Sequence, residues 1–448
     1  APRTMIEGIR SLLPGHWLRV SADGHSIEMR RYWKLDRRGD GNFDLDEIRA
    51  RLQEAVTLRL VSDVPLGAFL SGGLDSSTVV ALMARSGQDV RTFSITFDEA
   101  EYDESKFSNQ VAQRFQTTHT EVRLRRQDFA AWLPDALAAM DQPTFDGINT
   151  YCVARAARES GLTVALSGAG ADEVFGGYPY FRTVPWFGRM ARLARHVPAP
   201  LAGWVLSRLR HQPFRVAGVY KTLELLCRDV GAPDALMAGY QVVQLHYPQW
   251  SRQAFTDIGA VETNAVWFGL PVECVDFVRD EIAGDTPANC LSKISLRLHL
   301  AERCLRDIDA MSMGVSLEVR APFLDHLFLE SAWQAPGGLR CRGVPNKPFE
   351  IEVVRPYLGD DYAYRNKQGF IFPFEEWLRD DVFSERVGAV LSEAELARTI
   401  GFRPQAVQEL VRLFMPRGHA PRQGRIPWSR IWSLFVLFQW CERHQVKL

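Results

Sequence analysis

Short apolar runs alternate with amphipathic, helix-like segments over the first 180 residues of the chain. The pattern predicts strands over residues 65–70, 90–97, 120–124 and 162–167. It predicts helices over residues 45–60, 75–85, 103–115, 127–140 and 149–160, with Asp44 capping the first of them. Strands that alternate with helices in this way indicate an α/β fold, a doubly wound parallel sheet with helices on both faces.

The pattern changes after Tyr178 to long helical stretches with no clear strand. We therefore expect residues 43–180 to form the α/β core and residues 181–448 a helical lobe that closes over the sheet. Residues 1–42 form a separate N-terminal piece that ends in a linker rich in charged residues and glycine. The apolar segment Trp428 to Trp440 contains Arg430, which favours a buried terminal helix over a membrane span.

Composition narrows the class of protein. The 448 residues are 46% hydrophobic, enough for a large core, and the net charge of -1 gives no general attraction to nucleic acid. The seven cysteines are scattered without metal-binding spacing, which is typical of a reducing, cytoplasmic setting. We expect no membrane partner, because no apolar run is long enough to span a bilayer. A homodimer is possible.

The segment Ser71 to Ser77 reads Ser-Gly-Gly-Leu-Asp-Ser-Ser and joins a predicted strand to a predicted helix. Such a turn presents free backbone N–H groups and the positive end of a helix to one point, where polyphosphate binds. A carboxylate at Asp75 suits this place if a divalent cation lies between it and the phosphate. The segment has neither the Walker A ending nor the dinucleotide fingerprint. The plainer alternative is a turn that only caps a helix.

A second turn of small residues and acids, Ser167 to Glu173, follows the predicted strand 162–167. At the carboxyl ends of parallel strands the two turns would face each other across a crevice, so that Asp75 and Asp172 share one magnesium ion. Alternatively, Asp172 and Glu173 only favour the start of a helix by interacting with its dipole.

These two turns and the segment Met311 to Asp325 resemble the synthetase domain of glutamine-dependent asparagine synthetases and their relatives, the β-lactam synthetases and lasso-peptide cyclases. The resemblance runs from about Leu58 to the end, includes residues 102–105 and 365–370, and thins out between residues 185 and 287. It implies the fold of the ATP pyrophosphatases. Residues 4–33 look like the last strands of the family's glutaminase domain, whose cysteine nucleophile has no counterpart here. Either the chain is a fragment, or its nitrogen donor is not glutamine handled by this chain.

The resemblance implies that ATP and Mg²⁺ are cofactors and that a substrate carboxylate attacks the α-phosphorus before an amine or ammonia displaces AMP. Pyrophosphate and magnesium would be held by Ser71, Gly72, Gly73, Asp75, Ser76 and Ser77, with Asp172 as the second metal ligand. The nucleotide would also contact Phe69, Ile95, Ser167 and Gly168, of which Phe69, Ile95 and Gly168 match positions whose backbone holds adenine. Lys367 would stabilise the pentavalent phosphorus and Lys347 would lie near the phosphates, unless either is a surface lysine. Glu318 would orient or deprotonate the amine, and Arg320 is a further catalytic candidate. The two residues could also form a plain salt bridge, and the two interpretations are not exclusive.

Ala169 departs from the family pattern, because asparagine synthetases carry glutamate and lactam-forming relatives carry tyrosine at that position. This puts aspartate as acceptor, and ammonia as nucleophile, in doubt. We expect an ATP-dependent amide-forming ligase, with asparagine synthesis as the default and amidation or cyclisation of another small-molecule or peptide carboxylate as the alternative. Two other functions are possible alternatives: a non-catalytic relative that binds nucleotide, and a tRNA-modifying enzyme with the same loop.

Overall fold

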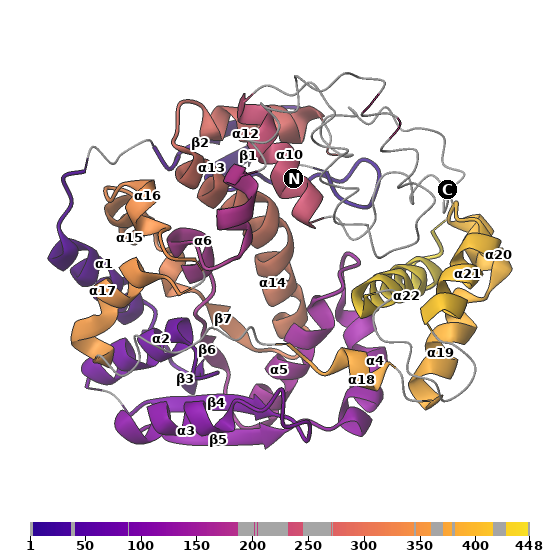
Figure 1. Ribbon diagram of the computed structural model, residues 1–448, viewed down its shortest axis with the longest axis horizontal. Helices are drawn as coiled ribbons and strands as arrows, with labels where there is room; N and C mark the ends of the chain where they lie inside the picture. The colour runs from indigo at the N-terminus through magenta and orange to yellow at the C-terminus, as the bar shows by residue number, and fades with distance from the viewer. Residues whose placement is uncertain are drawn as a thin grey trace.

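Five parallel strands form the central sheet (Figure 1). The computed structural model describes residues 3–36, 41–87, 89–186, 201, 204, 232–244, 270, 272–344, 346–359, 371–378, 381–414 and 427–446. The strands run in the order β5 (Thr118–Arg123), β4 (Arg91–Thr96), β3 (Leu66–Phe69), β6 (Val164–Leu166) and β7 (Glu318–Arg320). After β3 the chain first builds the sheet toward β5 and then returns to the other side with β6, so the strand order switches between β3 and β6. In open parallel sheets, ligands bind beside the carboxyl ends of the strands at such a point.

The four predicted strands are all present in the sheet, and their parallel pairing is confirmed. The expectation that no strand follows Tyr178 was wrong, because β7 pairs in parallel with β6. With three residues, β7 is too short to show an alternating pattern. It is a strand because the edge of β6 offers backbone hydrogen-bonding partners, which only the tertiary structure brings to it.

Helices cover both faces of the sheet, as the alternating pattern predicted. One buried core joins Ala68 and Leu166 to side chains of α1 (Leu45–Leu58), α2 (Leu74–Arg85), α3 (Ser105–Arg114), α15 (His326–Ala332) and α17 (Pro348–Leu358). The other core joins Phe93 and Ala165 to side chains of α4 (Arg126–Ala139), α5 (Gly147–Glu159) and α14 (Arg306–Met313). The Asp44 carboxylate accepts the backbone N–H of Asp46 at 2.9 Å, so the predicted cap of α1 is confirmed.

The C-terminal helices extend the second core. They are α18 (Phe374–Trp377), α19 (Asp381–Leu391), α20 (Ala394–Thr399), α21 (Pro404–Phe414) and α22 (Trp428–Arg443), and the last four lie together at one end of the molecule (Figure 1). Trp432 of α22 is buried and packs against Phe129 of α4. The buried terminal helix is therefore confirmed. Within the described part of the chain, no helix combines the length and apolar character that crossing a bilayer requires.

The remaining described helices come after β6 and before α18 in the sequence. They comprise α6 (Ala171–Phe175), α10 (Ala232–Gln244), α12 (Val272–Ile282), α13 (Pro287–Ile294), the π-helix η2 (Ser295–Leu305), the short 3₁₀ turn η3 (Pro322–Leu324) and α16 (Gly337–Arg340). The π-helix continues directly into α14. Such wide turns are uncommon and occur mainly near functional sites.

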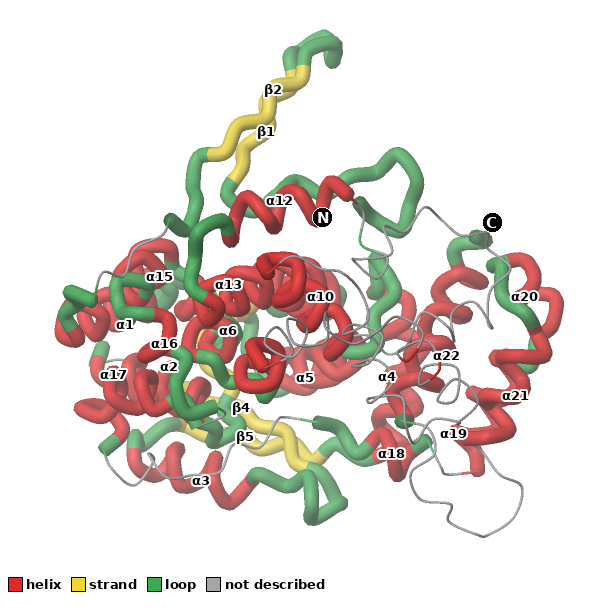
Figure 2. Tube along the Cα trace, turned by 45° about the horizontal axis from the view of Figure 1, so that its top comes forward, coloured by secondary structure: helices red, strands yellow, loops and turns green. Residues whose placement is uncertain are grey.

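The N-terminal residues form an antiparallel hairpin, β1 (His16–Val20) and β2 (Ile27–Arg31), that projects from the body of the molecule (Figure 2). Arg31 and Lys34, at its base, pair with Asp280 of α12 at 3.3 and 2.9 Å. The two strands agree with the expected strands of residues 4–33. That they are the end of a glutaminase domain, and that the chain divides after residues 42 and 180, stay predictions.

Candidate active site

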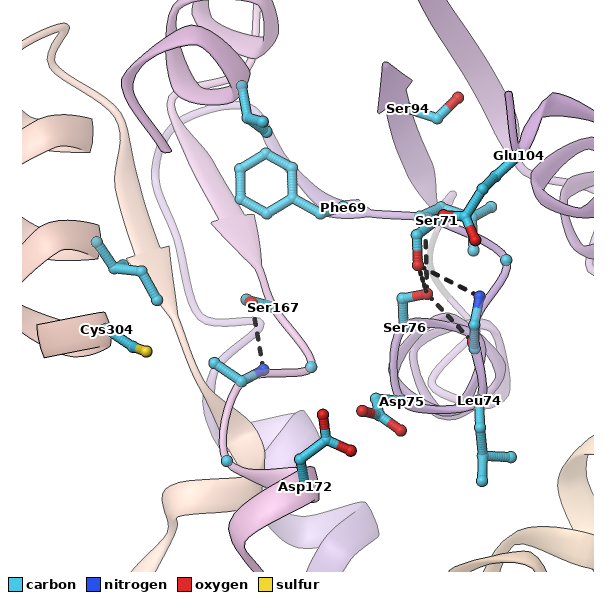
Figure 3. Close-up of a pocket in the computed structure, with 18 of the residues that line it drawn as sticks. Phe69, Ser71, Leu74, Asp75, Ser76, Ser94, Glu104, Ser167, Asp172 and Cys304 are labelled. Atoms are coloured by element: carbon cyan, nitrogen blue, oxygen red, sulfur yellow. Dashed lines mark hydrogen bonds between the residues drawn. The ribbon is translucent and has the colours of Figure 1, made fainter. Parts of the chain in front are cut away.

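A cavity of about 450 Å³ opens at the carboxyl ends of β3 and β6, where the strand order switches. Both predicted turns line it, together with residues of β4, α5, η2, α14 and β7. The close-up in Figure 3 shows Ser71 and Ser76 on one side of this cavity, Cys304 on the other, and Asp75 and Asp172 between them. The sequence reasoning therefore located the cavity correctly.

The first turn is held in shape by its own hydroxyl groups. The Ser71 and Ser76 Oγ atoms lie 3.1 Å apart, Ser76 Oγ donates to the carbonyl of Gly73, and Ser71 Oγ accepts the N–H of Gly73 at 3.3 Å. Gly72 has a φ of +72°, and a Cβ there would lie 2.7 Å from the backbone of Phe107. Only glycine fits this place without displacing α3.

The second turn packs directly against the first. A Cβ on Gly168 would lie 2.8 Å from the Cβ of Asp75, so the missing side chain is what lets the two turns meet. Ser167 donates its N–H to the carbonyl of Arg320 at 2.8 Å, and its Oγ accepts the N–H of Ala169 at 3.2 Å. The carboxylates of Asp75 and Asp172 point toward one another in Figure 3.

Lys347 joins the two carboxylates. Its Nζ makes a short ion pair with Asp75, lies 3.1 Å from Asp172 and lies 2.7 Å from Glu350. The Lys347 side chain is 3% exposed, whereas those of Asp75 and Asp172 are 25% and 18% exposed and line the cavity. The alternative of a solvated surface lysine is therefore wrong for Lys347.

Burial disfavours the charge of Lys347, but the negative charges of Asp75, Glu350 and Asp172 outweigh it and raise the pKa of Lys347. The site thus keeps a permanent ammonium group between its two metal-binding candidates. Lys347 also has a left-handed backbone, with φ +46° and ψ +58°, where the chain enters α17. Such a backbone is unusual for a residue other than glycine and often marks a functional position.

Glu350 was missed by the sequence reasoning. It lies one helical turn after Lys347, a spacing that brings a lysine and a glutamate together and that was available as a signal. Its side chain is fully buried. Burial, followed by the charge of Asp75, raises the pKa of Glu350.

Glu173 and Tyr178 also line the cavity and were not predicted as site residues. The Tyr178 hydroxyl donates to the Glu173 carboxyl at 2.9 Å, and His299 Nε2 lies 3.9 Å from the same group. Burial and the neighbouring charge of Asp172 raise the pKa of Glu173 to about 7. Burial, together with the Arg303 guanidinium, lowers the pKa of His299 to about 4, so the imidazole is neutral at pH 7.

Most of the predicted nucleotide contacts line the cavity: Phe69, Ser71, Gly72, Gly73, Asp75, Ser76, Ile95, Ser167 and Gly168. Ser77 is the exception. It is fully buried in α2, where its N–H donates to Gly73, and it does not belong to the cavity lining. Its predicted contact with pyrophosphate therefore has no support from the geometry. Ser77 follows the first turn of α2, and its own N–H already takes part in the hydrogen bonding of the helix. Lys367 lies outside the described residues.

Glu318 and Arg320 are placed away from the cavity. The register of β7 sets Glu318 opposite Val164, three residues before the turn that begins at Ser167. Arg320 Nε lies 2.7 Å from Glu318, and its Nη1 donates to the carbonyls of Arg59 and Val61 at 2.8 Å. This geometry favours the plain salt bridge, and the catalytic roles of the two residues stay predictions without structural support.

The residues present fit a magnesium ion. In the described part of the chain no three His, Cys, Asp or Glu side chains are grouped to hold a metal by themselves. Mg²⁺ needs no such group in nucleotide sites, because it usually takes one or two carboxylates and completes its shell with phosphate oxygens and water. Asp75 and Asp172 supply two carboxylates that face each other across the cavity.

A family model described as asparagine synthase matches residues 47–442. The chain belongs to the asparagine synthase family. The match includes both turns, Lys347 and the π-helix, so the whole cavity lies within the family domain.

Curated relatives in the asparagine synthase family carry more than one name. The chain is 28% identical to asparagine synthetase [glutamine-hydrolyzing] 3 of Bacillus subtilis, over 82% of this chain and 55% of that protein. It is 27% identical to a putative asparagine synthetase of Mycobacterium bovis, over 98% of this chain and 65% of that protein. It is also 26% identical to amidase chyE of Penicillium rubens, over 84% and 60% of the two chains. The chain thus spans about 55% to 65% of the length of these relatives.

Proposed function

We propose that this chain is an ATP-dependent ligase that adenylates a substrate carboxylate, releases pyrophosphate, and forms an amide with ammonia or an amine. The observation that carries the proposal is the meeting of Asp75, Asp172 and Lys347 at the switch point between β3 and β6. Family membership supports the same reaction class. The proposal includes an ATP pyrophosphatase-type fold and a cytoplasmic location.

Each part of the site has a task in this proposal. The first turn of α2 offers backbone N–H groups, and Ser71 and Ser76 offer hydroxyls, to the leaving pyrophosphate. Asp75 and Asp172 would hold Mg²⁺, which neutralises phosphate charge when bound. Lys347 adds a buried positive charge beside them, where electrostatic stabilisation of the growing negative charge is most effective.

The intact charge pattern speaks against a non-catalytic relative. Burying a lysine among three carboxylates costs desolvation free energy, so a contribution to stability does not by itself explain this group of charges. Strongly shifted pKa values in a cavity are typical of functional sites. A tRNA-modifying role has no feature in its favour, since the net charge is -1.

The test is pyrophosphate release from ATP and Mg²⁺ with a panel of carboxylates, with and without ammonia. Asp75→Asn should lower release at least about a hundredfold, because it removes a carboxylate from the phosphate and metal site. Asp135→Asn is the matched control, since Asp135 is an exposed residue of α4 that pairs with Arg155 at 2.9 Å. Undiminished release by Asp75→Asn, with Asp135→Asn also active, would refute the metal assignment.

A further inference from the structure

The cavity continues past the second turn into a region that phosphate binding does not use. This region is bounded by the Ala169 turn, by α5, by the π-helix with α14, and by β7. Its apolar lining consists of Val153, Ala169, Leu300, Ile308 and Val319, with the thiol of Cys304 beside them. In Figure 3, Cys304 lies across the Ser167 turn from Ser71 and Ser76. The second turn lies between this region and the first turn, which leaves the region open to the carboxylate acceptor of the proposed reaction.

Most polar groups around this region pair with each other, although two buried atoms, Asn149 Oδ1 in the cavity lining and Arg303 Nε, have no hydrogen-bond partner among the described residues. The Arg303 guanidinium donates to His299 Nδ1 at 2.8 Å and lies 3.5 Å from Asp146. Asp307 accepts the Thr144 hydroxyl at 2.7 Å, and Glu173 accepts that of Tyr178.

The remaining ionisable groups of the lining add no cation for an acceptor. Among the described residues that line the cavity, Lys347 is the cationic side chain, and three carboxylates surround it. Burial raises the pKa of the Cys304 thiol to about 12, so it stays neutral.

An acceptor such as aspartate carries an ammonium and a second carboxylate besides the group that is activated. The Asn149 amide oxygen can accept from the ammonium, but the described residues that line the cavity offer no cation besides Lys347 to the second carboxylate, and burying an unpaired charge is strongly unfavourable. An apolar substituent would instead replace water against Leu300, Ile308 and Val319, which is favourable.

We propose that the acceptor is a monocarboxylate with an aliphatic or aromatic body, which packs against Leu300, Ile308 and Val319, rather than aspartate. This inference rests on the proposed adenylating function and specifies its substrate class.

Pyrophosphate release with ATP and Mg²⁺ is the first test. The panel contains aspartate, glutamate, straight-chain and branched aliphatic acids, and aryl-substituted carboxylic acids. We expect kcat/KM for the best apolar acid to exceed that for aspartate by at least about a hundredfold. Release led by aspartate or glutamate would overturn the acceptor class and leave adenylation standing. No release with any acid of the panel would overturn adenylation itself, and the acceptor class with it.

A pair of variants on the same π-helix tests the placement. Leu300 is 3% exposed and lines the cavity, whereas Leu298 lines a separate cavity with Tyr240 and Cys274. Leu300→Asn should raise KM for the apolar acid roughly tenfold or more and leave KM for ATP within about twofold. Leu298→Asn makes the same chemical change and should move neither constant. Equal effects of the two variants, or a rise confined to KM for ATP, would overturn the proposed acceptor region.

Discussion

Replacing Lys347 with methionine is expected to destabilise the protein strongly, because it leaves the buried Glu350 and the partly exposed Asp75 and Asp172 without their cation. Lys347 Nζ contacts Asp75, lies 3.1 Å from Asp172 and lies 2.7 Å from Glu350, and Glu350 is fully buried. Methionine keeps most of the apolar stem and removes only the charge. Breaking a buried ion pair from one side costs about 3–5 kcal/mol, a large part of the stability of an ordinary domain.

The double variant Lys347→Met with Glu350→Leu separates loss of the pair from loss of packing. Removing both partners of a buried pair is often nearly neutral, so Glu350→Leu should return about 1–3 kcal/mol to the Lys347→Met protein. Asp75 and Asp172 are partly exposed, and water can solvate what remains of their charge.

The assay is urea unfolding at pH 7.5 without divalent cations, for the wild type, both single variants and the double variant. The cycle gives the coupling free energy between residues 347 and 350 directly. The reasoning fails if Lys347→Met costs less than about 1 kcal/mol, or if the two substitutions are simply additive, since either result means that the ammonium does not stabilise Glu350.

Two further substitutions test the phosphate turn and the histidine beside Glu173. Gly72→Ala forces a Cβ to within 2.7 Å of the Phe107 backbone at a φ of +72°, so pyrophosphate release should fall at least about tenfold. Gly73→Ala, at an ordinary φ of −70° and 3.3 Å from Ser71 Oγ, is the milder control, and equal losses would contradict the argument. Because the pKa of His299 is lowered to about 4, the unfolded chain binds its proton first, and His299 should lower stability by up to about 3 kcal/mol between pH 6.5 and pH 4. Glu173, whose pKa is raised to about 7, opposes this loss because the folded chain binds its proton first. In urea unfolding, stability should therefore rise more steeply toward low pH in His299→Gln than in the wild type, and equal slopes would contradict the assignment to His299.

The alternating pattern and the two turns were readable from the sequence because their causes are local. A buried strand needs a short apolar run. A tight turn after it needs glycine where φ is positive, as at Gly72, or where another backbone segment comes very close, as at Gly168. The positions of Asp75 and Asp172 followed from one rule, that parallel strands end at the same edge of the sheet. The parallel sheet, its two helical layers and most of the cavity lining were therefore predictable.

The rest was decided by contacts between residues far apart in the chain. The strand β7 forms only because β6 offers it an edge, and the same register places Glu318 three residues short of the site. No local pattern shows that Lys347 lies between Asp75 and Asp172, since the cost of burying its charge is offset only where the tertiary fold brings the carboxylates together. The apolar wall from Leu300 to Val319 is likewise a product of packing, because the same residues would read as ordinary core in any helix or strand. Local sequence determined the two turns at Ser71 and Ser167, whereas tertiary packing decided the apolar wall of the cavity.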